Sequence, residues 1–90
     1  MERIIITVVG KDTVGIIAKV STYLANIDVN ILDISQTIVS GFFNMLMVAD
    51  RADSTVDFNT CQEELSKLGE EIGVQIKCQK EEIFDMMHRI

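Results

Sequence analysis

The residues of this sequence whose types and spacing could do chemistry stand together in one short segment, Val8–Ile17. The segment begins as an apolar strand, passes through a polar turn that contains Gly10 and Gly15, and enters a helical pattern. A helix that starts in such a turn directs free backbone N–H groups and the positive end of its dipole into the loop. The sequence therefore predicts an anion site here, suited to the carboxylate of a small ligand.

The side chains of this loop have structural interpretations beside the binding ones. Asp12 either accepts the ammonium group of a ligand or, like Thr13, caps the helix that follows. Gly15 either lets a ligand approach the backbone or lets the helix pack closely on a sheet. Lys11 is either a clamp for an anion or a solvated charge. Both interpretations are kept for each residue.

Six elements must position this loop, and their residue patterns are typical of short strands and amphipathic helices. Strands are expected at residues 3–9, 31–39, 42–49 and 74–79, and helices at 14–26 and 58–72. The order βαββαβ predicts an α+β, ferredoxin-like fold, a four-stranded antiparallel sheet with two helices on one face. Residues 1–80 are expected to form a single domain, and residues 81–90 a short C-terminal helical extension of it.

Local signals mark several of the element ends. Ser40 and Gly41 are typical of a tight hairpin turn between the second and third strands. Ser54 with Asp57 resembles a capping box at the start of the second helix. Gly73 is suited to the C′ position at the end of that helix.

The apolar residues of the strands indicate both the strand order and an unpaired surface. The first and third strands are apolar on both faces, which favours central positions, and the alternating second and fourth strands are expected at the edges. Because the helices cover one face, Ile5, Val9, Phe42 or Phe43, and the methionines of the third strand are expected to leave the other face apolar. The C-terminal helix, a second subunit or both would cover that face, so a homodimer or a higher even oligomer is predicted.

Composition excludes several classes of partner. The apolar share is 48% and the net charge is −6, and a surface this acidic is repelled by nucleic-acid phosphates and by anionic membranes. Cys61 and Cys78 are interpreted as buried free thiols in a reducing compartment. The chain begins without a signal-peptide pattern and has no apolar run long enough to span a bilayer, so a cytoplasmic location is expected.

The sequence also argues against catalysis. It has no paired nucleophile and base, no metal-ligand spacing and no GxxxxGK phosphate loop, and it implies no cofactor. An acylphosphatase-type enzyme on the same element order would need an arginine in the first loop, where this chain has Lys11.

The order and spacing of these motifs resemble the ACT domain family. The resemblance rests on Asp12-x-x-Gly15-Ile16 after the first strand and on Asn30-Ile31 after the first helix, and it is closest to the short stand-alone ACT proteins akin to the glycine cleavage system regulator. It implies an effector bound between two domains by the first loop and the turn after the first helix. The positions so implied are Gly10, Lys11, Asp12, Thr13, Val14, Gly15 and Asn30.

Two functions remain as hypotheses. The first is a non-catalytic regulatory module that binds a small metabolite, an amino acid, at a dimer interface. The alternative is a protein–protein interaction or assembly module without a ligand, which uses the open sheet face and the C-terminal helix. Asn30 is accordingly either a ligand contact or a turn residue with a positive φ.

Overall fold

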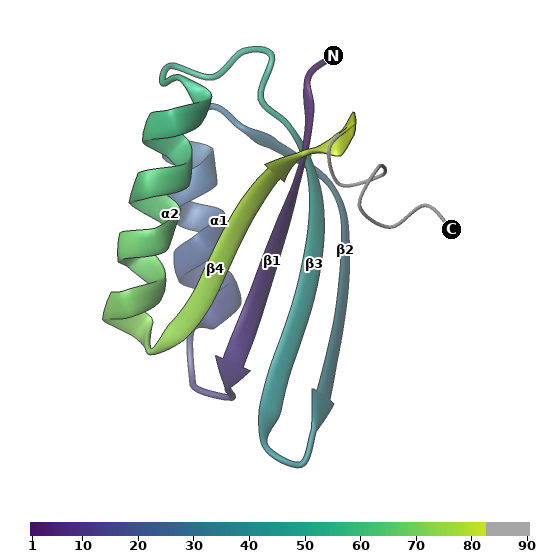
Figure 1. Cartoon of the computed structure of the whole chain (residues 1–90), viewed down its shortest axis with the longest axis vertical. Helices are drawn as coiled ribbons and strands as arrows, with labels where there is room; N and C mark the ends of the chain where they lie inside the picture. The colour runs from purple at the N-terminus through teal and green to yellow at the C-terminus, as the bar shows by residue number, and fades with distance from the viewer. Residues whose placement is uncertain (83–90) are drawn as a thin grey trace.

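The computed structural model describes residues 1–82, which form a four-stranded sheet with two helices on one face (Figure 1). The elements are β1 (Arg3–Lys11), α1 (Ile16–Asn26), β2 (Asn30–Val39), β3 (Phe42–Asp50), α2 (Phe58–Ile72) and β4 (Val74–Lys80). The strand order is β2-β3-β1-β4 and each neighbouring pair is antiparallel. The βαββαβ fold predicted from the sequence is confirmed. The helix predicted at 81–90 extends beyond the described residues.

The two central strands are β1 and β3, as their apolar character on both faces predicts. Their register pairs Ile5 with Val48 and Thr7 with Leu46, and these side chains lie on the face away from the helices. The edge positions of β2 and β4 are also confirmed.

The hydrophobic core lies between the sheet and the two helices. Alternate residues of β1 point into it, and α1 and α2 each contribute a fully buried stripe. The residues with no measurable exposure are Ile4, Ile6, Val8, Val20, Leu24, Met47, Ala49, Cys61 and Leu65. Burial of this apolar surface is the main force that holds the helices on the sheet.

The expected distribution of the third strand's side chains is wrong in part. Phe43, Met45 and Met47 are buried on the helix side of the sheet, whereas Phe42 lies on the open face beside Lys11. The methionines therefore fill the core and do not make the open face apolar. Much of the exposed apolar surface instead gathers along β2, where Leu32, Ile34, Ile38 and Val39 are 39–62% exposed.

Backbone conformation explains the turns. Ser40 and Gly41 have φ values of 51° and 82°, the left-handed pair that a two-residue hairpin requires, so the predicted turn is confirmed. Gly73 ends α2 with φ 89°, as predicted. After α1 the left-handed residue is Asp28, with φ 58°, whereas Asn30 is already the first residue of β2. The interpretation of Asn30 as a turn residue with a positive φ is therefore wrong.

The start of α2 differs from the predicted capping box. Asp57 is the N-cap, and its Oδ1 accepts a hydrogen bond of 2.8 Å from the backbone N–H of Thr60. Ser54 lies further upstream, where its Oγ accepts a bond from the backbone N–H of Val56. Asp57, which the capping box placed inside the helix, is thus itself the N-cap.

Candidate functional site

The loop between β1 and α1 is attached to the hairpin between β2 and β3. The backbone N–H of Asp12 donates a hydrogen bond of 2.8 Å to the carbonyl oxygen of Gly41. This bond follows the last register pair of the two central strands, Lys11 with Phe42. The loop therefore begins from a fixed position at one end of the sheet.

The first turn of α1 has no side-chain cap. Its N-cap is Gly15, in the left-handed conformation with φ 88°, and no side chain at this position bonds to the N–H groups of the turn. The predicted caps Asp12 and Thr13 are therefore wrong, because the helix begins two or three residues later than they require. Backbone N–H groups without a capping side chain are the groups that bind anions at helix starts.

The role of Gly15 follows from its backbone rather than from helix packing. A Cβ atom at this position would meet only the Cε atom of Lys19, at 4.0 Å, so close packing of the helix on the sheet is not the reason for a glycine. The backbone φ of 88° is the reason, because a residue with a Cβ atom is sterically strained in this left-handed region.

A shallow hollow of about 230 Å³ lies between this loop and the hairpin strands. Its wall on one side is the loop and the first turn of α1, and its floor comes from β2 and β3. The lining residues are Asp12, Thr13, Gly15, Ile16, Ile17, Ala18, Gln36, Ile38 and Phe43. The volume lies below the roughly 300–1,000 Å³ of drug-sized sites, which restricts it to a small ligand.

The structure brings together some of the residues that the sequence predicts for this site. Asp12, Thr13 and Gly15 line the hollow. Lys11 and Val14 are exposed beside it, and the side chain of Val14 is 95% exposed. All five residues are therefore candidate contacts of a ligand that extends out of the hollow.

Gly10 has a packing role within the sheet. A Cβ atom there would lie 2.8 Å from Cγ1 of Val74, which pairs with Gly10 in the neighbouring strand. The glycine thus permits the close approach of β4 to β1. Its contribution to the loop is through its backbone.

Asn30 lies far from the loop within one chain. It pairs with Asp50 at one end of β3, whereas the loop follows Lys11, which pairs with Phe42 at the other end. Eight residue steps along a strand separate these positions, a distance of roughly 26 Å. A single copy of the chain cannot present Asn30 and the loop to one small ligand.

Six lining residues of the hollow lie outside the set that the sequence predicts: Ile16, Ile17 and Ala18 of α1, and Gln36, Ile38 and Phe43 of the hairpin strands. A signal for the three strand residues existed in the hairpin turn. A two-residue turn at Ser40 and Gly41 fixes the register so that Ile38 faces Phe43 across the ladder.

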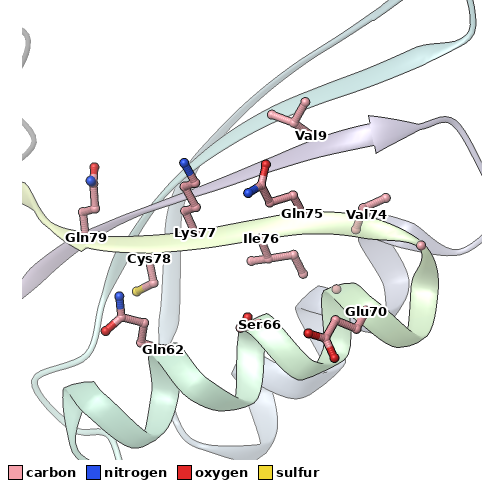
Figure 2. A pocket seen from close by; sticks show the side chains of 12 residues that line it. Val9, Gln62, Ser66, Glu70, Val74, Gln75, Ile76, Lys77, Cys78 and Gln79 are labelled. Carbon is pink, nitrogen blue, oxygen red and sulfur yellow. The ribbon is translucent and has the colours of Figure 1, made fainter.

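A larger groove, of about 720 Å³, runs along the free edge of β4 (Figure 2). Gln62, Ser66 and Glu70 of α2 form one wall, and β4 forms the other. Figure 2 shows Lys77 pointing away from α2, so the groove does not bring an acid and a base together. Within residues 1–82 no three His, Cys, Asp or Glu side chains gather as a metal site.

The buried thiols of Cys61 and Cys78 lie in the core between α2 and β4. A hydrogen bond between the two thiols raises the pKa of Cys78 and lowers that of Cys61, and burial adds to the rise at Cys78. The prediction that both are buried and free is confirmed. Both are core side chains, and neither lines the hollow beside the first loop.

These features define a small α+β module of the ferredoxin-like type with an open helix start at one end of its sheet. The chain belongs to the ACT domain family, whose sequence pattern matches residues 2–79. The family resemblance seen in the sequence is thereby confirmed. ACT domains are in general regulatory and bind small molecules.

Known relatives match most or all of the chain. A UPF0237 protein of Bifidobacterium longum is 59% identical over 90 residues and covers all of both chains. An ACT domain protein from Streptococcus pneumoniae has a TM-score of 0.81 at 40% identity and covers 93% of this chain and 94% of its own. A structure described as a glycine cleavage system transcriptional repressor has a TM-score of 0.73 at 23% identity. It covers 88% of this chain and 45% of its own, and shares the fold.

No helix among residues 1–82 has the length and apolar character needed to cross a bilayer.

Proposed function

We propose that this chain is a non-catalytic regulatory module that binds an amino acid at the interface between two copies of itself. The observation that carries the proposal is the uncapped first turn of α1 above the hollow. The N–H groups of this turn suit the carboxylate of an amino acid. The carboxylate of Asp12, on the same rim, suits its ammonium group.

The size of the hollow supports a ligand of this class. Its polar rim comes from the loop, and its floor contains Ile38 and Phe43. An amino acid with a small apolar side chain matches both parts. A phosphate ester is a poorer match, since the chain carries a net charge of −6 and Asp12 lies on the rim.

The position of Asn30 supports a site shared by two copies. The loop and Asn30 lie at opposite ends of one sheet, roughly 26 Å apart. A site that uses both must take the loop from one protomer and Asn30 from the other. The proposal places the dimer in the cytoplasm, where the buried thiols stay reduced.

The proposal is tested by a thermal-shift screen of the standard amino acids, followed by calorimetric titration of the best hit. A ligand that binds only the folded protein raises the melting temperature with its concentration. Binding by the wild type, weakened in Asn30→Ala, supports the shared site. Equal affinity in Asn30→Ala removes Asn30 from it.

An assembly module without a ligand is the second candidate. The observation in its favour is the apolar exposure along β2, where Ile38 is 55% and Val39 62% exposed. This candidate predicts oligomers that no amino acid stabilises. A flat thermal-shift screen on an oligomeric protein would favour it.

A further inference from the structure

The packing of α2 on β4 brings two thiols together. The helix approaches the strand so closely that a Cβ atom at Gly69 would lie 2.7 Å from the carbonyl oxygen of Val74. Cys61 precedes Gly69 by about 12 Å of helix, and Cys78 follows Val74 by about 13 Å of strand. Because β4 returns along α2 after Gly73 (Figure 1), the two displacements match. The thiols of Cys61 and Cys78 therefore meet, in hydrogen-bond contact.

The groove along the free edge of β4 reaches this pair. Its volume is about 720 Å³, and Cys78 is one of its lining residues. Figure 2 shows the sulfur of Cys78 directed toward α2, beside the side chain of Gln62. Cys61 has no exposed surface and Cys78 is 1% exposed. Because both thiols are almost fully buried, the groove favours a small reagent over a bulky one.

A buried cation lies near the two sulfurs. The guanidinium of Arg51 donates through Nη1 to Oε1 of Glu2 and through Nη2 to the carbonyl oxygen of Val56, each at 2.6 Å. Its Nε is buried and has no hydrogen-bond partner in the described part of the chain. The hydrogen bond from Cys78 and the charge of Arg51 outweigh burial and hold the pKa of the Cys61 thiol below its usual value. The thiolate so favoured is the nucleophilic form of cysteine.

From this geometry we propose that Cys61 and Cys78 form a dithiol site that a hydroperoxide oxidises to a disulfide. The Cys61 thiolate attacks one oxygen of hydrogen peroxide, the O–O bond breaks, and the hydroxide that leaves takes up the proton that Cys61 released. The sulfur of Cys78 then attacks the sulfenic acid of Cys61, loses its own proton, and displaces a second water. The two sulfurs give up two electrons and the peroxide accepts them. Two thiols and one hydrogen peroxide thus become one disulfide and two waters.

The product suits its position in the core. A disulfide carries no charge, so it removes the cost of holding a thiolate away from water. It joins α2 to β4, and thiol–disulfide exchange in a reducing compartment returns it to two thiols. The pair shares no residue with the hollow beside the first loop. This inference therefore does not rest on the proposed amino-acid site.

Alkylation after peroxide treatment tests the disulfide. The reduced full chain is treated with hydrogen peroxide, quenched with catalase, unfolded in urea and alkylated with iodoacetamide, and intact mass spectrometry counts the alkylated thiols. We expect both thiols to be lost together, with a mass about 2 Da lower and no covalent dimer on a non-reducing gel. Dithiothreitol should restore both thiols. The proposal is overturned if the folded chain keeps both thiols at a peroxide concentration that oxidises the urea-unfolded chain.

Cys78→Ala and Cys61→Ala are the matched variants that assign the two roles. Without Cys78, oxidation should stop at the sulfenic acid of Cys61, which dimedone traps. In Cys61→Ala the remaining thiol lacks the favoured thiolate, and little adduct is expected. Peptide mapping of the wild type, trapped with dimedone at short times, gives the same assignment if either variant fails to fold. Equal adducts on the two cysteines reject Cys61 as the attacking thiol.

Gln62→Phe tests the groove as the path of the oxidant. A phenylalanine at this position fills the groove beside Cys78 and is expected to slow the loss of thiols several-fold. Glu63→Phe, the next residue on α2 and outside the groove lining, is the control and should keep the wild-type rate. Equal rates in the two variants would reject the groove as the path.

The outcomes separate this inference from the proposed function. A chain that forms the disulfide and binds no amino acid keeps the dithiol site and rejects the ligand site. A chain that binds an amino acid and whose folded thiols resist peroxide does the reverse.

Discussion

The N–H of Asp12 and the carbonyl of Gly41, 2.8 Å apart, join the loop before α1 to the turn between β2 and β3. This bond makes the loop part of the sheet rather than a free connection. It also means that the hollow depends on two chain segments, one before α1 and one in the hairpin. Substitutions in either segment should therefore alter the shape of the hollow.

Gly15→Ala is expected to lower both stability and ligand affinity. The φ of 88° costs an alanine about 1–2 kcal/mol. Relief of that strain would turn the first N–H groups of α1 away from the hollow. Chemical denaturation measures the first effect, and titration with the best thermal-shift hit measures the second.

Gly73→Ala is the control for Gly15→Ala. Its φ of 89° brings the same strain, and it lies at the far end of α2, outside the hollow. The control should lose similar stability and keep its affinity. Equal affinity loss in both variants would mean that global destabilisation, and not the loop, weakens binding.

The sequence contains enough information for the strand order but not for the faces of β3. Strands with apolar residues on both faces must be central, and this argument places β1 and β3 correctly. Because both faces of these strands are apolar, the sequence does not show which of their residues point to the helices. Phe42 and Phe43 are equally apolar, and only the packing of α1 and α2 buries the second of them.

The candidate site was predictable in its loop and not in its full extent. Asp12, Thr13 and Gly15 follow from a strand–turn–helix pattern that the sequence displays. The start of α1 was misplaced because Gly15 takes a left-handed conformation that no side-chain pattern reveals. The separation of Asn30 from the loop follows from topology, since α1 carries the chain back along the length of the sheet.

Gly69→Ala is expected to destabilise the protein although alanine favours helices. A Cβ atom at Gly69 would lie 2.7 Å from the carbonyl oxygen of Val74 and 3.0 Å from Cγ1 of Ile76. The gain in helix propensity is about 1 kcal/mol, whereas a forced shift of packed elements costs about 1–3 kcal/mol. Urea denaturation of Gly69→Ala should therefore show a lower free energy of unfolding.

The control for Gly69→Ala is Ser66→Ala, an exposed position on the same helix. This variant gains propensity without a clash and should be at least as stable as the wild type. If Gly69→Ala were as stable as the control, α2 and β4 would have room to separate at no cost.

Leu65→Ala should be among the more harmful changes to α2. Leu65 has no exposed surface and packs in the core between the helices and the sheet. Removal of a buried leucine side chain costs about 2–5 kcal/mol, depending on how far the cavity collapses. A melting temperature within one or two degrees of the wild type would contradict the burial.

Acid should weaken the start of α2 through Asp57. Hydrogen bonds from the Thr60 side chain and backbone N–H lower the pKa of the Asp57 carboxyl below its usual value. A lowered folded-state pKa stabilises the protein above the unfolded pKa, near 3.8, and this contribution is lost as the pH falls. Asp57→Ala should lower the free energy of unfolding at neutral pH and weaken its dependence on pH in the acid range. Asp53→Ala, upstream of the helix, is the control and should change neither.

Tyr23 offers a direct optical test of how α1 is joined to α2. Its hydroxyl donates a hydrogen bond of 2.6 Å to Oε1 of Glu64, and burial together with this bond raises the pKa of Tyr23 above 10.0. Tyr23 is the single tyrosine of a chain without tryptophan, so the ultraviolet absorbance of tyrosinate reports it alone. A raised folded-state pKa means that the stabilisation is present below pH 10 and is lost as the pH rises further.

Glu64→Gln is expected to lower the pKa of Tyr23 toward, but not to, its ordinary value. The amide oxygen still accepts a hydrogen bond, whereas the negative charge that opposes ionisation is gone. Glu63→Gln, the exposed neighbour on α2, is the matched control and should leave the titration unchanged. An identical midpoint in the wild type and in Glu64→Gln would show that the negative charge of Glu64 does not raise the pKa of Tyr23.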